Sequence, residues 1–127
     1  MKKTILMLAL FILSCSSFEK KAINITKRTL KYAEKGDFVS LRELFKTDFD
    51  KDSINFLSEM KKIHELLIHN SSPDVKYDKY NSNYINGIVK CSLGQLPDEI
   101  VTYNLELNFV DQKGEAILMG YFLDRQI

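Results

Sequence analysis

The chain has 127 residues, with 18 lysines and arginines against 17 aspartates and glutamates, and a formal net charge of +1 at pH 7. This near-neutral balance argues against nucleic acid as the main partner, because nucleic-acid-binding domains carry a clear basic excess. The length allows one compact domain after the first segment and leaves no comfortable room for two.

The first segment has the pattern of an export signal. Lys2 and Lys3 give it a positive start, and the apolar run 5–13 is far shorter than the roughly 20 residues that a membrane-spanning helix needs. The run ends in Ile12-Leu13-Ser14-Cys15, which resembles the lipobox of bacterial lipoproteins. The alternative is an ordinary secretory signal in which a cysteine falls near the cleavage point by chance.

The lipobox resemblance implies cleavage between Ser14 and Cys15 and attachment of acyl chains to Cys15. Two or more chains hold a protein stably on a membrane, so we expect a lipid-anchored protein of the bacterial cell envelope, with the membrane as a partner. The expected organisation is a signal peptide over 1–14, a lipidated N-terminus and short tether over 15–19, and a single domain over 20–127. Cys91 is then the one remaining thiol, and we expect it to serve as a small apolar residue.

Helical spacing of apolar residues predicts three helices in the first half of the chain. They cover 18–35, a short segment ending near Thr47, and about 53–69. Gly36 suits the end of the first helix and Asp37 the start of the second. Residues 19–35 contain six basic and two acidic residues, whereas 93–127 contain two basic and six acidic residues. We therefore expect the basic face of the first helix to lie near the bilayer. The alternative is a helix face that is simply solvated.

After Pro73 the apolar period changes from helical to two, which predicts four strands over 75–80, 85–93, 101–109 and 115–124. The third strand alternates most clearly, with one apolar and one polar face. The fourth is apolar on both faces for much of its length, which predicts a central strand or one covered on each side. The fold class is α+β, with three N-terminal helices packed on a curled four-stranded antiparallel sheet.

The segment from Tyr32 to Leu41, a helix followed by Lys-Gly-Asp and a new helix, resembles the opening of small lipoproteins in the cystatin-like superfamily of the nuclear transport factor two type. That resemblance implies a cone-shaped domain whose interior can hold a ligand. Enzymes of the superfamily place carboxylates or histidines inside the cone, but many members are binding or accessory domains.

His64 and Tyr103 are the candidate pocket residues. A helical wheel places His64 beside Leu57, Met60 and Leu67, so it is predicted to line the seam between helix and sheet. The alternative for His64 is a partly buried histidine with one hydrogen-bond partner. Tyr103 lies on the apolar face of the third strand. We expect no catalytic residue, metal or cofactor, because no second inward ionisable group supports His64 and because His69 does not share its helix face.

We therefore expect a non-catalytic binding or accessory domain for an envelope protein or a small ligand. One alternative is an enzyme of the ketosteroid-isomerase type with a pocket acid or base. Another is an inhibitor or immunity factor against an envelope enzyme, which would present an exposed loop such as Gly94 to Asp98. The tyrosines Tyr77, Tyr80 and Tyr84 around one hairpin fit either a contact patch or ordinary strand composition.

Overall fold

The computed structural model describes residues 17–45 and 54–127, so Cys15 lies outside the described residues. The elements in chain order are α2 (Ser17–Lys35), α3 (Phe38–Leu44), α4 (Ile54–His69), β1 (Val75–Lys79), β2 (Gly87–Gly94), β3 (Thr102–Gln112) and β4 (Glu115–Gln126). The predicted α+β class is confirmed. The predicted end of the second helix near Thr47 and the predicted start of the third at Ser53 lie outside the described residues.

The junction between α2 and α3 is built by the two residues that the sequence singles out. Gly36 has a φ of +73°, which glycine adopts without a steric penalty. The Gly36 and Asp37 amides donate to the carbonyl groups of Ala33 (3.1 Å) and Tyr32 (2.9 Å), the paired bonds that close a helix C-terminus. Asp37 then begins α3 by accepting a 3.2 Å hydrogen bond from the Ser40 amide.

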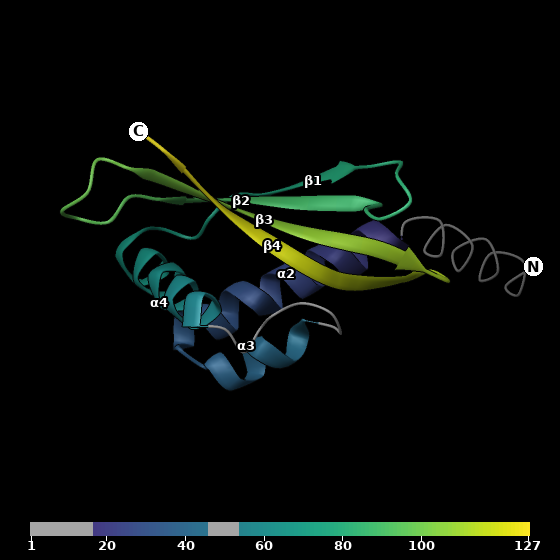
Figure 1. Cartoon of the computed structure of the whole chain (residues 1–127), viewed down its shortest axis with the longest axis horizontal. Coiled ribbons are helices and arrows are strands. Elements are labelled where there is room, and N and C mark those ends of the chain that lie inside the picture. The colour runs from purple at the N-terminus through teal and green to yellow at the C-terminus, as the bar shows by residue number, and fades with distance from the viewer. Residues whose placement is uncertain (1–16, 46–53) are drawn as a thin grey trace, which may run out of the picture.

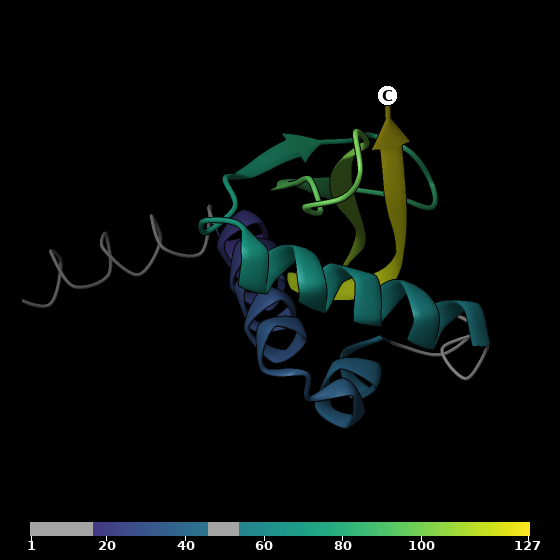
Figure 2. The same cartoon turned by 90° about the vertical axis from the view of Figure 1, so that its left-hand side faces the viewer.

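The four strands form one antiparallel sheet in the order β1-β2-β3-β4. The helices lie together on one face of this sheet, as the two perpendicular views show (Figure 1, Figure 2). Alternate residues of β3 are buried beneath them, as the two-residue period predicts: Tyr103, Leu105, Leu107 and Phe109. The other face of β3 is partly exposed.

The core between the helices and the sheet is almost entirely apolar. Large buried side chains come from both layers, including Leu41, Phe56, Met60, Ile63, Val89, Leu107 and Phe109. Cys91 lies among them, and burial raises the pKa of its thiol to about 12. The thiol is therefore un-ionised at neutral pH and acts as an apolar filler, as expected from the sequence.

The last strand differs from its prediction. In the described part of the chain β4 is an edge strand that pairs with β3, and on its outer side Phe122 is 56% and Met119 37% exposed. The expectation of a central or doubly covered strand is therefore wrong. A register shift opposite Asn108 and Phe109 interrupts the alternation. Apolar residues consequently follow one another along the strand without both sides being buried.

Candidate functional site

Tyr103 stands at the centre of a polar cluster between β3 and α4. It is only 1% exposed, and its hydroxyl donates a 2.6 Å hydrogen bond to Glu99. The same hydroxyl accepts a 3.2 Å hydrogen bond from the Lys62 ammonium, which lies 3.7 Å from the Glu99 carboxylate. The Lys62 nitrogen also lies 5.2 Å from the centre of the Tyr103 ring. These three groups therefore bind one another.

A second tyrosine beside this cluster is arranged in the same way. The Tyr121 hydroxyl donates a 2.6 Å hydrogen bond to Glu59, and burial raises the pKa of this phenol. Residues of α4, β3 and β4 border a hollow of about 330 Å³ here: Asn55, Ser58, Glu59, Lys62, Tyr103, Leu123 and Arg125. The hydrogen bond that the Lys62 ammonium donates to the Tyr103 hydroxyl raises the pKa of Lys62, which therefore stays protonated at neutral pH. The Lys62 ammonium is thus already bound within the fold by Tyr103 and Glu99.

His64 lies apart from this hollow. Its Nδ1 atom is 2.8 Å from the carbonyl oxygen of Ala33, and its ring meets Phe38 edge to face at 6.2 Å. His64 thus faces the junction of α2 and α3, whereas the sequence places it in the seam with the sheet. The difference arises because α4 packs against α2 as well as the sheet. His64 and Tyr103 do not share a site, and a partly buried histidine with one partner describes His64.

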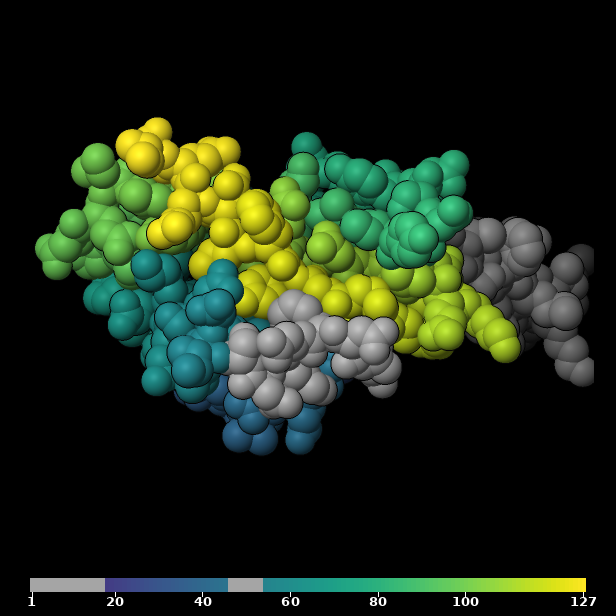
Figure 3. All heavy atoms as spheres, in the orientation of Figure 1, coloured from purple at the N-terminus to yellow at the C-terminus, as the bar shows by residue number. Residues whose placement is uncertain are grey.

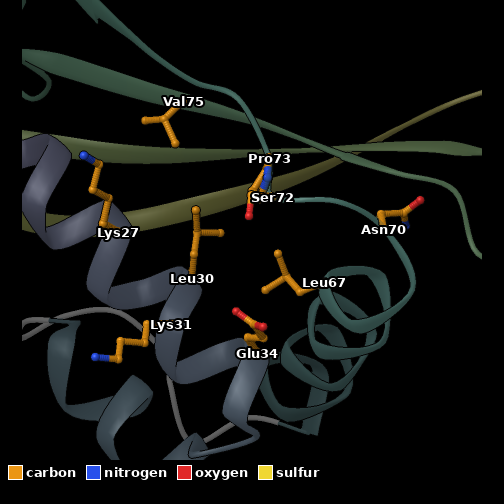
Figure 4. Close-up of a pocket in the computed structure, with 9 residues that line it drawn as sticks. All are labelled: Lys27, Leu30, Lys31, Glu34, Leu67, Asn70, Ser72, Pro73 and Val75. Carbon is orange, nitrogen blue, oxygen red and sulfur yellow. The ribbon is translucent and has the colours of Figure 1, made fainter.

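A different hollow has two lysines at its border that form no ion pair within the described part of the chain. It has a volume of about 320 Å³ and lies between α2, α4 and the start of β1 (Figure 4). We call it the α2–α4 hollow, and its lining residues are Lys27, Leu30, Lys31, Glu34, Leu67, Asn70, Ser72, Pro73 and Val75. Figure 4 shows Leu30 and Leu67 pointing into the space between the two helices, with Pro73 above them. The floor of this hollow is therefore apolar.

Lys27 and Lys31 border the α2–α4 hollow from successive turns of α2, and both are exposed. No ion pair joins either lysine to another described residue. Glu34 lies on the next turn and is the one carboxylate in the lining. Asn70 is held in place because its amide donates to the carbonyl groups of Leu66 (2.9 Å) and Gln95 (3.0 Å). Two lysines that form no ion pair with a described residue thus border a hollow lined by Leu30 and Leu67.

Sequence reasoning placed these lysines on a basic helix face expected to lie near the bilayer, and it did not foresee the hollow. Its apolar residues come from three separate elements, α2, α4 and β1, so no local pattern brings them together.

The loop from Gly94 to Asp98, which an inhibitor would present, is partly held in place by contacts with the rest of the domain. Leu96 packs against the core, and Gln95 donates a 3.2 Å hydrogen bond to Thr102. Ile100 just beyond that loop is 77% exposed.

A scan against protein-family models, a search of curated proteins and a search of solved structures each found no match to this chain. Among the described residues, no helix is both long and apolar enough to cross a membrane. The same residues contain no group of three or more histidines, cysteines, aspartates or glutamates arranged to hold a metal ion.

Proposed function

We propose that this chain is a lipoprotein of the bacterial cell envelope, anchored through acyl chains on Cys15, whose single domain over 20–127 binds a ligand without catalysing a reaction. The ligand is small and largely apolar, carries one acidic group, and occupies the α2–α4 hollow. The observation that carries the ligand proposal is a pair of lysines, Lys27 and Lys31, that lie beside apolar residues and form no ion pair with any residue that the structure describes.

The dimensions and chemistry of the hollow suit such a ligand. Its volume of about 320 Å³ lies at the lower end of the usual range for small-molecule sites, roughly 300–1,000 Å³. Leu30, Leu67 and Val75 offer apolar surface, whose burial supplies most of the free energy of binding. The lysines at its border attract an acidic group, while Glu34 disfavours ligands with several negative charges.

The ionisable groups near Tyr103 favour binding over chemistry of the ketosteroid-isomerase type. Proton transfer needs a group whose pKa is close to the working pH. The raised pKa of Lys62 keeps it protonated, and the raised pKa of Tyr121 keeps it neutral. His64 contacts the Ala33 carbonyl and does not line the hollow beside Lys62. A non-catalytic domain accounts for these arrangements more simply than an enzyme does.

We also propose that the fold is cystatin-like, with the sheet curled around the side that the helices cover. The order of the described elements, three helices followed by four antiparallel strands, supports this assignment. The Tyr32 to Leu41 segment supports it further, because its Gly36 and Asp37 form the expected helix-turn-helix junction.

Ligand binding is tested with the chain beginning at Ser16, using 1-anilinonaphthalene-8-sulfonate as a fluorescent acidic probe and 4-phenylbutyrate as its competitor. Replacing Lys27 and Lys31 together by Gln should weaken 4-phenylbutyrate binding about twofold to fivefold per lysine, the effect of one exposed charge pair. Glu34→Gln should tighten it by a similar factor. Lys35→Gln combined with Lys61→Gln is the matched control, since both are exposed lysines outside the hollow. Equal affinities in all four proteins would refute the proposed site.

A further inference from the structure

One end of the domain is formed by three segments that are far apart in the sequence. They are the start of α2, the β1–β2 loop (80–86) and the β3–β4 hairpin turn (111–114). Figure 1 shows these three together, with the β2–β3 loop and the C-terminus at the opposite end. The space-filling view shows the same loop and hairpin at this end of the molecule (Figure 3). We call it the tether end.

Hydrogen bonds join the three segments into one surface. The Lys21 ammonium donates to the Gly114 carbonyl (3.3 Å) and to the Glu115 carboxylate (2.8 Å), which binds α2 to the hairpin. The Asp111 amide donates a 2.8 Å hydrogen bond to the side-chain oxygen of Asn86, which binds the hairpin to the β1–β2 loop. The tether end is therefore a fixed part of the fold rather than three independent loops.

The tether end exposes aromatic rings and lysines. Tyr84 is 82% and Tyr80 43% exposed, although Tyr77 of the same hairpin is partly buried against Phe18, 6.4 Å away. Three lysines of this end, Lys20, Lys79 and Lys113, are exposed and form no ion pair with a described residue. Tyrosine concentrates at the level of lipid headgroups, and lysine is attracted to anionic lipid. Both residue types match the surface of a bilayer.

The length of chain before α2 places this end near the lipid anchor. Cys15 precedes Ser17, the first residue of α2, by two positions. A fully extended chain spans at most about 3.6 Å per residue, so the Cα atoms of Cys15 and Ser17 lie within about 7 Å of each other. Lys27, by contrast, lies ten residues farther along α2 than Ser17, or about 15 Å at the helical rise. Acyl chains on Cys15 therefore bring the start of α2, and the surface around it, to the membrane first.

We propose that the tether end rests on the bilayer surface, with Tyr84 at the headgroup level and the α2–α4 hollow held above the membrane. This inference rests on the proposed lipid anchor at Cys15 and adds the orientation of the domain. It differs from an orientation in which the basic side of α2, including Lys31, lies along the bilayer. The β2–β3 loop with Ile100 then projects farthest into the envelope.

The chain contains no tryptophan, so a single introduced tryptophan reports its own position. The mature lipidated protein is prepared as Tyr84→Trp, with Tyr80→Trp as a second reporter. Ile100→Trp is the matched control, because Ile100 is also largely exposed but lies at the opposite end. Lys31→Trp reports the side of α2. Each variant is reconstituted into phosphatidylglycerol-containing vesicles with brominated acyl chains, and flotation of the vesicles measures anchoring separately.

We expect all variants to float with the vesicles. Tyr84→Trp should lose about half of its emission and shift to shorter wavelength, as a ring at the membrane interface does, whereas Ile100→Trp and Lys31→Trp keep theirs. Floating protein with unquenched Tyr84→Trp and Tyr80→Trp would overturn the orientation and leave the anchor intact. Quenching of Lys31→Trp alone would replace it with the side-on orientation. Failure of every variant to float would overturn the proposed anchor, and the orientation with it.

Discussion

The Nδ1 atom of His64 lies 2.8 Å from the carbonyl oxygen of Ala33, at the point where α2 ends. The same carbonyl accepts the Gly36 amide at 3.1 Å. The last carbonyl groups of a helix lack partners within the helix, so His64 of α4 completes the cap of α2 and joins the two helices. Its position is explained by this contact without a catalytic role.

Replacing His64 by Ala should lower the free energy of unfolding by about 1–2 kcal/mol, because the variant loses one part-buried hydrogen bond and the edge contact with Phe38. His64→Gln keeps a polar group and should cost less. Urea denaturation measures both, with His69→Ala as the control, since His69 is exposed. A stably folded, membrane-anchored His64→Gln protein that fails to complement a deletion strain while it still binds ligand would argue for chemistry at His64.

Tyr103→Phe tests whether the Tyr103 cluster is structural. The change removes a hydroxyl that donates to Glu99 and accepts from Lys62, and should destabilise the fold by about 1–2 kcal/mol. Binding of 4-phenylbutyrate in the α2–α4 hollow should not change. Tyr84→Phe, on an exposed side chain, should leave stability as it is. If Tyr103→Phe instead abolished ligand binding in a stable protein, the ligand would have to bind at Tyr103 and not in the α2–α4 hollow.

The buried thiol of Cys91 predicts a loss of stability at alkaline pH. Its ordinary pKa of 9.0 applies to the unfolded chain, and burial raises the folded pKa to about 12. The contribution of the un-ionised Cys91 thiol to the free energy of unfolding is therefore complete below about pH 9. It decreases as the pH rises towards 12, by up to about 1.4 kcal/mol per pH unit. The raised pKa values of Tyr121 and Lys62 also lower the free energy of unfolding at alkaline pH, but only above about pH 10.

Urea denaturation at intervals of about one unit from about pH 8 to pH 11 measures this slope. Cys91→Ala removes the thiol and should flatten the curve between about pH 9 and 10, whatever the variant loses in packing. An unchanged slope in that interval would show that the Cys91 thiol is not shielded from water as the structure has it.

The edge position of β4 predicts a contrast between two phenylalanines. Phe122→Ala should cost less than about 1 kcal/mol, because most of the Phe122 ring is already exposed. Phe109→Ala removes a fully buried ring from the neighbouring strand and should cost about 3–5 kcal/mol. Similar losses in chemical denaturation would mean that the outer side of β4 is covered.

The spacing of apolar residues correctly predicted the elements in which burial alternates regularly along the chain. The alternation from Tyr103 to Phe109 predicted β3 and its buried face because one side of the strand is buried without interruption between these two residues. The same reasoning failed for β4. There a register shift and an exposed Phe122 break the relation between an apolar run and burial on both sides.

The candidate site was less predictable because tertiary contacts create it. The partner of His64 is a backbone carbonyl, which leaves no trace in the sequence. Tyr103 was correctly placed on the buried side of its strand, yet Lys62 and Glu99 reach it from other segments. The basic spacing of Lys27 and Lys31 was visible, but their proximity to Val75 depends on how α2 packs beside β1.

Acylation of Cys15 is the central claim, because both localisation and orientation depend on it. Cells expressing the wild-type chain, Cys15→Ala or Cys91→Ala are labelled with radioactive palmitate and separated into membrane and soluble fractions. We predict that the wild type and Cys91→Ala are labelled and found in the membrane fraction, and that Cys15→Ala is unlabelled and leaves it. Cys15→Ala that remained labelled and membrane-bound, or a wild-type protein without label, would contradict the account.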